Sequence, residues 1–176
     1  MLDSRDMIQH YEVPFYSQFQ DIPAIEWQKK GCGIASLAMA IGFYKPDAVS
    51  ITTLLKEGLV SGAYVKNVGW SHKGLTDLVT NYGLIGEIHD FTKLKAQKAL
   101  DGLRDVIDKG PVVASIHNKF DPSATLGHLV VLTGYDDQFI FYNDPSGTSD
   151  RKISNANFLR GWKRRVISVR GSQTPL

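Results

Sequence analysis

Apolar and polar positions along the chain divide it into a helical first part and a strand-rich second part. Residues 32–44 carry apolar side chains at helical spacing, from Ile34 to Ile41, and predict a largely buried helix. Pro46 ends this run because proline disfavours helix in the residue before it. We expect an extended segment at residues 13–16 and a loop at residues 17–31 before this helix.

Three further helices are expected before residue 110. Ser50 is a typical cap for a helix over residues 51–57, and Gly58 would end it. A loop over residues 58–74 follows, and then a short helix over residues 75–82 that ends at Gly83. Residues 92–109 are amphipathic and predict a fourth helix, closed by Gly110 and Pro111.

The second part of the chain is typical of an antiparallel sheet. Strands are expected at residues 112–116, 128–135, 138–143 and 163–170. Helices first and strands second indicate the α+β class. No Pro/Ser-rich linker separates the two parts, so we expect a single domain over residues 1–176, helical over about 1–110 and sheet over about 111–170.

Composition excludes several classes of protein. With 43% hydrophobic and 22% charged residues, the chain is not disordered, collagenous or a coiled coil. No apolar run approaches the roughly 18–20 residues of a membrane span. Residues 1–9 are polar and lack the features of a secretory signal, so a cytoplasmic location is expected. A secreted or cell-surface location stays open if a signal peptide has been removed.

The net charge of +2 is unevenly distributed. The first 150 residues hold 13 basic and 18 acidic residues, a net charge of −5. The remainder has no acid and seven basic residues: Arg151, Lys152, Arg160, Lys163, Arg164, Arg165 and Arg170. No nucleic-acid-binding motif accompanies these charges, so we expect no nucleic-acid partner and a solvated edge strand protected by its charges.

The single cysteine, Cys32, is the first candidate for chemistry. One cysteine excludes an internal disulfide and zinc sites that need two or more cysteines. Cys32 stands at the start of the helix over residues 32–44, where the helix dipole and free N–H groups favour a reactive thiolate. Gly31 and Gly33 on either side would let another group approach the sulfur. The other interpretation is an inert small residue that begins a buried helix.

A thiol nucleophile needs a base, and the base needs a partner that orients it. His128 opens the strand over residues 128–135, and a hairpin returns the chain to Asn143 and Asp144 beside it. If paired residue numbers add to 273, Asn143 shares the face of His128; if they add to 274, Asp144 does. The sequence leaves both registers open. His72, His89 and His117 lack metal-ligand spacing, so neither a metal nor a cofactor is expected.

The order of these residues resembles that of the papain-like cysteine peptidases. Five stretches are similar to the double-glycine leader peptidase family and its stand-alone relatives: VPFYSQ at 13–18, GCGIASLAM at 31–39, GWSHKGL at 69–75, GHLVVLTGY at 127–135 and YNDPSG at 142–147. The resemblance spans roughly residues 13–147 and implies a papain-like fold. In that family the peptidase domain often precedes an ABC exporter and cleaves leader peptides after two glycines.

The resemblance implies roles for individual residues. Cys32 would be the nucleophile, His128 the base and Asp144 the residue that orients it, which selects Asp144 over Asn143. The family also has a glutamine before the cysteine whose amide helps to hold the oxyanion. Gln18 fits that pattern, and Gln28 is the alternative. The insertion over residues 19–27 departs from the tighter spacing of exporter domains.

The expected function is hydrolysis of a peptide or amide bond through a thioester acyl-enzyme, as in a bacterial thiol protease. The substrate would be a peptide or protein, with a leader peptide as one option. Two alternatives remain: an acyl or amine transferase on the same scaffold, and a non-catalytic peptide-binding module. The sequence does not fix the oligomeric state. Trp27, Tyr64 and Trp70 are candidate substrate contacts, although such aromatics more often belong to the core.

Overall fold

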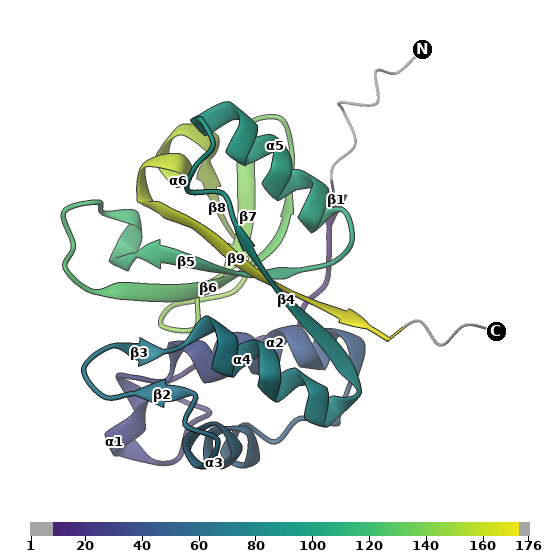
Figure 1. Cartoon of the computed structure of the whole chain (residues 1–176), viewed down its shortest axis with the longest axis vertical. Helices are drawn as coiled ribbons and strands as arrows, with labels where there is room; N and C mark the ends of the chain where they lie inside the picture. The colour runs from purple at the N-terminus through teal and green to yellow at the C-terminus, as the bar shows by residue number, and fades with distance from the viewer. Residues whose placement is uncertain (1–8, 173–176) are drawn as a thin grey trace.

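A computed structural model describes residues 9–172 and places a layer of helices against a twisted sheet (Figure 1). The helices are α1 (Ile25–Gln28), α2 (Cys32–Tyr44), α3 (Ile51–Val60), α4 (His72–Leu78), η1 (Val79–Tyr82), α5 (Ala96–Ile107), η2 (Asn118–Phe120) and α6 (Asn155–Gly161). The strands are β1 (Gln9–His10), β2 (Tyr64–Val65), β3 (Gly69–Trp70), β4 (Leu84–Asp90), β5 (Val112–His117), β6 (Gly127–Tyr135), β7 (Phe139–Asn143), β8 (Arg151–Ser154) and β9 (Trp162–Gly171).

Helix α2 has the bounds that the sequence predicts and lies at the centre of the molecule. All ten residues from Gly33 to Gly42 are buried, because the helix packs against α3 on one side and against strand β6 on the other. A helix that is apolar all round belongs to the interior of a protein. Its first residue therefore lies where the helical layer meets the sheet.

The main sheet has the strand order β4-β9-β5-β6-β7-β8, with β1 paired to β6, and every pair is antiparallel. Because side chains alternate along a strand, the sheet has two buried faces. Val113, Leu129 and Val131 belong to the core shared with α2. Ala114 and Val130 belong to the core shared with α5 and α6, on the other side of the sheet (Figure 1).

Several elements differ from the sequence predictions. Strands β4 and β8 and helix α6 were not predicted, since both strands are at the edges of the sheet and carry largely exposed residues without clear alternation. The loop predicted over residues 58–74 contains the β2–β3 hairpin, and α1 lies within the loop before Cys32. The fourth helix begins at Ala96 rather than at residue 92.

Two further predictions are wrong for identifiable reasons. Gly58 does not end the second helix, which continues to Val60; a β-carbon there would lie 2.8 Å from the Trp70 ring, so glycine is required by packing. The basic strand β9 is not at an edge but between β4 and β5, and only Arg151 and Lys152 of the basic segment lie on an edge strand, β8.

Candidate active site

Cys32 is the first residue of α2 and is partly exposed as a free thiol. Its two glycine neighbours serve packing. A β-carbon on Gly31 would collide with the Ile22 side chain, and one on Gly33 would lie 2.7 Å from the Trp70 ring. The chain therefore passes closely between two apolar side chains and leaves Cys32 at the surface of the helix N-terminus.

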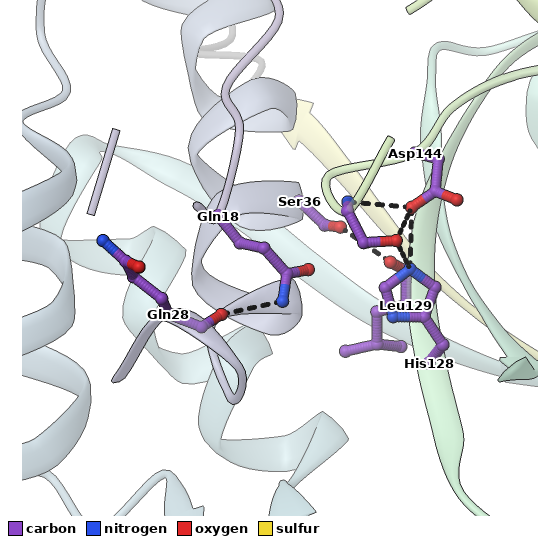
Figure 2. Close-up of polar contacts among 7 residues, drawn as sticks. Gln18, Gln28, Ser36, His128, Leu129 and Asp144 are labelled. Atoms are coloured by element: carbon purple, nitrogen blue, oxygen red, sulfur yellow. Dashed lines mark hydrogen bonds and ion pairs between the residues drawn. The ribbon is translucent and has the colours of Figure 1, made fainter. Parts of the chain in front are cut away.

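His128 is the second residue of β6, and its side chain is only 8% exposed. Its Nε2 lies 2.8 Å from Asp144 Oδ1 and 3.4 Å from Ser146 Oγ (Figure 2). Nε2 is thus occupied by Asp144. The remaining ring nitrogen, Nδ1, is the atom available to a second partner.

The β6–β7 register near His128 is the one in which paired numbers add to 274. Val131 pairs with Asn143 and Leu132 with Tyr142, and a bulge between Leu132 and Gly134 changes the register nearer the turn. Asp144, one residue past the strand, therefore faces His128. Asn143 is turned into the protein, where its Oδ1 accepts a hydrogen bond from Asp150 N at 3.0 Å.

The electrostatics of His128 and Asp144 favour a charged histidine. Burial by itself lowers the pKa of His128, but hydrogen bonds and charge interactions with Asp144 and Cys32 outweigh it and raise the pKa to about 9. Burial raises the pKa of Asp144, and the hydrogen bond and charge of His128, with two hydrogen bonds from Ser146, bring it below its ordinary value. An imidazolium next to a thiol stabilises the thiolate.

A short turn after β7 fixes the Asp144 carboxylate. Its Oδ1 accepts hydrogen bonds from Ser146 N at 2.9 Å and from Ser146 Oγ at 2.8 Å. Asp144 N donates to Thr148 O at 3.0 Å, and Gly147 N donates to Asp144 O at 2.9 Å. The sequence reasoning overlooked Ser146, although Asp-Pro-Ser is a recognisable Asx-turn pattern.

The side chain of Gln18 packs against Gly31, the residue before α2. Gln18 is 3% exposed, its backbone N donates to Pro145 O at 2.9 Å, and its Nε2 donates to Gln28 O at 2.8 Å (Figure 2). The second N–H of that amide remains free to donate. The Gln28 amide donates instead to Ile22 O at 2.9 Å and stays within its own loop. Gln18 thus joins the segments of Gly31 and Asp144.

A residue that the sequence reasoning did not single out joins the elements that carry Cys32 and His128. Ser36 Oγ, one turn after Cys32 on α2, donates to Leu129 O at 3.2 Å, and Leu129 follows His128 on β6. Both residues are buried. The signal in the sequence was the single serine within a largely apolar helix.

Of the other candidate residues, the histidines lie on other elements, whereas Trp70 and its two aromatic neighbours pack beside Gly33 in the helical layer. His72 begins α4, His89 lies in β4 and contacts Ser168 Oγ at 2.8 Å, and His117 ends β5. Within residues 9–172 no group of three His, Cys, Asp or Glu side chains is arranged to hold a metal ion. Trp27 and Tyr64 pack edge-to-face at 4.9 Å between ring centroids, and Trp70 lies beside both. These three rings form one aromatic cluster in the helical layer.

A cavity of about 380 Å³ also lies away from the candidate site. It is lined by the end of α5 and by residues of β4 and β9, including Glu87, His89 and Arg170. Cys32, His128 and Asp144 are not among the residues that line it. None of the helices in the described part of the chain has the length and apolar character that crossing a membrane requires.

Comparison with known proteins identifies the family. The profile described as "Peptidase_C39 like family" matches residues 10–167. The chain belongs to this Peptidase_C39-like family. Its membership confirms the resemblance seen in the sequence and supports a peptidase function in general terms.

A curated relative of this Peptidase_C39-like chain is uncharacterized protein YvpB of Bacillus subtilis (strain 168). It is 25% identical over 182 residues, which cover 87% of this chain and 71% of YvpB.

Solved structures of C39 domains share the fold. A C39-like protein from Bacillus anthracis superposes with a TM-score of 0.69 at 21% identity, covering 96% of this chain and 100% of that one. A double-glycine-motif protease from an AMS/PCAT transporter, solved with its leader peptide, superposes with a TM-score of 0.64 at 22% identity, covering 93% of this chain and 94% of that one. The peptidase domain of Streptococcus ComA superposes with a TM-score of 0.64 at 18% identity, covering 93% of this chain and 100% of that one. The α+β, papain-like fold is therefore confirmed.

Proposed function

We propose that this protein is a cysteine peptidase that hydrolyses a peptide or amide bond through a thioester on Cys32. The observation that carries the proposal is the contact of His128 Nε2 with Asp144 at 2.8 Å, which leaves Nδ1 for the thiol proton. The raised pKa of His128, to which Cys32 contributes, supports a thiolate–imidazolium pair. Asp144 would fix the tautomer and orientation of the ring.

In the acylation step, the Cys32 thiolate attacks the substrate carbonyl carbon and forms a tetrahedral oxyanion. The backbone N–H of Cys32 and the free N–H of the Gln18 amide are the proposed donors to that oxygen. The C–N bond then breaks, and the leaving amine takes the proton from His128 Nδ1. The acyl group remains on sulfur as a thioester.

In the deacylation step, water attacks the thioester carbonyl and gives its proton to His128. The C–S bond breaks, the carboxylic acid leaves and the thiolate–imidazolium pair is restored. An amine in place of water would give transfer instead of hydrolysis, with the same four residues in the same roles. A peptide or protein is the proposed substrate, and a leader peptide of the kind in the PCAT complex is one candidate.

The experiment that tests the proposal is alkylation of Cys32 by iodoacetamide across the pH range, with the label located by mass spectrometry. Fast labelling is expected well below the ordinary thiol pKa of about 8.5, and His128→Ala is expected to abolish that fast phase. A single ordinary thiol titration in both proteins would refute the activated nucleophile. Peptide cleavage assayed with and without added amine then separates hydrolysis from transfer, and tight peptide binding without any cleavage would indicate a binding module.

A further inference from the structure

A cationic side chain lies against Gly127, the residue that precedes His128 on β6. A β-carbon placed on Gly127 would lie 2.9 Å from Lys163 Nζ, so the ammonium group of Lys163 rests on the residue that precedes His128. Lys163 is partly buried, whereas Gly127 is exposed. Among residues 9–172, no carboxylate forms an ion pair with Lys163, and its side chain makes no hydrogen bond.

The backbone of β9 is irregular at this lysine. On strand β5, Ser115 pairs with Arg165 and Ile116 pairs with Trp162, so Lys163 and Arg164 have no partners there. Arg164 has a φ of 62°, in the left-handed region that a non-glycine side chain rarely adopts. Bulges of this kind redirect side chains and are common beside active sites, and local strain concentrates at functional positions.

The side chain of Arg164 is directed elsewhere, whereas the ammonium group of Lys163 lies against Gly127, the residue before His128. Arg164 Nη1 donates to Leu94 O at 3.2 Å, and Arg164 O accepts from Phe91 N at 2.7 Å. These contacts hold the middle of the bulge to the segment between β4 and α5. The left-handed backbone of Arg164 therefore affects the direction of the adjacent Lys163 side chain.

Among residues 9–172, Lys163 has no ion-pair partner of its own. Arg165, two residues on, is paired with Asp90 at 3.2 Å. Burial, and then the charge of Arg165, lower the pKa of His72; Asp90 acts in the opposite direction, and Lys163 lowers this pKa further. Lys163 is thus a cation without an ion pair beside Gly127, the residue before the proposed base, and its complement is a carboxylate.

We infer that Lys163 is a specificity-determining residue that binds an acidic side chain of the substrate near the scissile bond. The inference rests on the proposed function, because it assumes that a peptide lies between Cys32 and His128. A substrate carboxylate would form a charge-assisted hydrogen bond with the Lys163 ammonium while the adjacent backbone lies against Gly127. Glycine at 127 leaves room for both.

The first test uses two alkylating reagents that differ in charge, iodoacetate and iodoacetamide, on Cys32 of the full chain. In both reactions the thiolate displaces iodide, so their rate ratio reports the local electrostatic preference for a carboxylate. Lys163→Ala should lower the iodoacetate-to-iodoacetamide ratio about 5-fold and Lys163→Glu further. Lys152 lies on edge strand β8, with its ammonium 4.5 Å from the Phe139 ring centroid. Lys152→Glu makes the same change in net charge as Lys163→Glu and should leave the ratio unchanged.

The second test uses peptide pools that differ only by Glu or Gln at each position near the cleaved bond. The wild-type protein should cleave one Glu peptide about 10-fold faster than its Gln counterpart, and Lys163→Glu should shift that preference toward Lys. Equal cleavage of all pairs, or a rate ratio unchanged by both Lys163 variants, would overturn the inference. If no peptide is cleaved, the peptidase proposal fails, and the alkylation ratio still decides the role of Lys163.

Discussion

Ser36 on α2 and Leu129 on β6 are 93 residues apart in sequence and are joined by a buried hydrogen bond of 3.2 Å. Cys32 lies one helical turn before Ser36, and His128 directly precedes Leu129. This bond therefore connects the element of the proposed nucleophile with the element of the proposed base. Their relative position is set by packing between two layers, not by a loop.

Ser36→Ala should destabilise the protein and reduce the reactivity of Cys32. It removes the donor to a buried carbonyl, which costs about 1–3 kcal/mol in the free energy of unfolding. Urea denaturation measures that loss, and iodoacetamide labelling measures the reactivity. Ser61→Ala is the matched control, since Ser61 Oγ bonds Gly58 O only three residues away. Equal behaviour of the two variants would contradict a role for Ser36 in joining the layers.

The charge of His128 should make stability depend on pH. Its pKa is raised from 6.5 to about 9, so the stabilisation from its charged form is fully present below pH 6.5 and is lost as pH rises through about 9. NMR titration of the imidazole should give a midpoint near 9. Unfolding at pH 6 and pH 10 should show the decline, and His128→Asn should flatten it. A midpoint near the ordinary 6.5 would contradict the ion pair.

Substitutions at Asp144 and at Asn143 should have different effects, the first on the His128 pKa and the second on stability. Asp144→Asn removes the negative charge beside His128, so the His128 pKa should fall and Cys32 should react more slowly at neutral pH. Asn143→Ala leaves Asp150 N without its acceptor and should cost about 1–2 kcal/mol of stability with little change in the His128 pKa. Thermal unfolding measures the loss of stability, and NMR titration measures the His128 pKa. Similar His128 shifts in both variants would contradict the observed register.

Gln18 should matter for acyl transfer but not for alkylation. Gln18→Ala removes a proposed oxyanion donor and should lower the rate of peptide hydrolysis about 10²–10³-fold. Alkylation by iodoacetamide forms no oxyanion, so its rate at Cys32 should be unchanged. Gln28→Ala serves as the comparison and should have the smaller effect on hydrolysis. The reverse order would assign the oxyanion role to Gln28.

Gly58→Ala should destabilise the protein even though alanine favours helix. The added carbon would lie 2.8 Å from the Trp70 ring and 3.2 Å from Ile34 Cδ1, and overpacking of this kind costs more than the helical preference returns. A net loss of about 1–2 kcal/mol in unfolding free energy is expected. Gly171→Ala is the control, since nothing lies within 4 Å of its added carbon. A gain in stability for Gly58→Ala would show that the ring can move aside.

The elements with strong hydrophobic patterns could be predicted from the sequence, and the elements defined by their partners could not. Helix α2 and strands β5 and β6 are buried on all or most sides, so their apolar runs identified them. Strand β4 pairs only with β9 and is largely exposed, so its residues carry no such pattern. The position of β9 inside the sheet depends on long-range pairing, which no local pattern encodes.

The candidate site shows the same division. Cys32 and His128 were found because each stands at the boundary of a predictable element, and Asp144 because of the resemblance to a family. Strand register alone did not decide whether Asn143 or Asp144 faces His128, because the register depends on a bulge between Leu132 and Gly134. Lys163 had no local signal, because its position depends on a two-residue irregularity in β9.

The central place of β9 bears on when the protein can complete its fold during synthesis. The sheet joins β4 to β5 only through β9, which follows every other strand of residues 9–172 in the chain. Until then β5, the neighbour of the strand that carries His128, has an open edge, and β4 has no partner. Cys32 is translated early, yet the sheet beside it stays incomplete until about residue 171 has emerged. A nascent chain thus carries its thiol long before it has the folded sheet that would activate it.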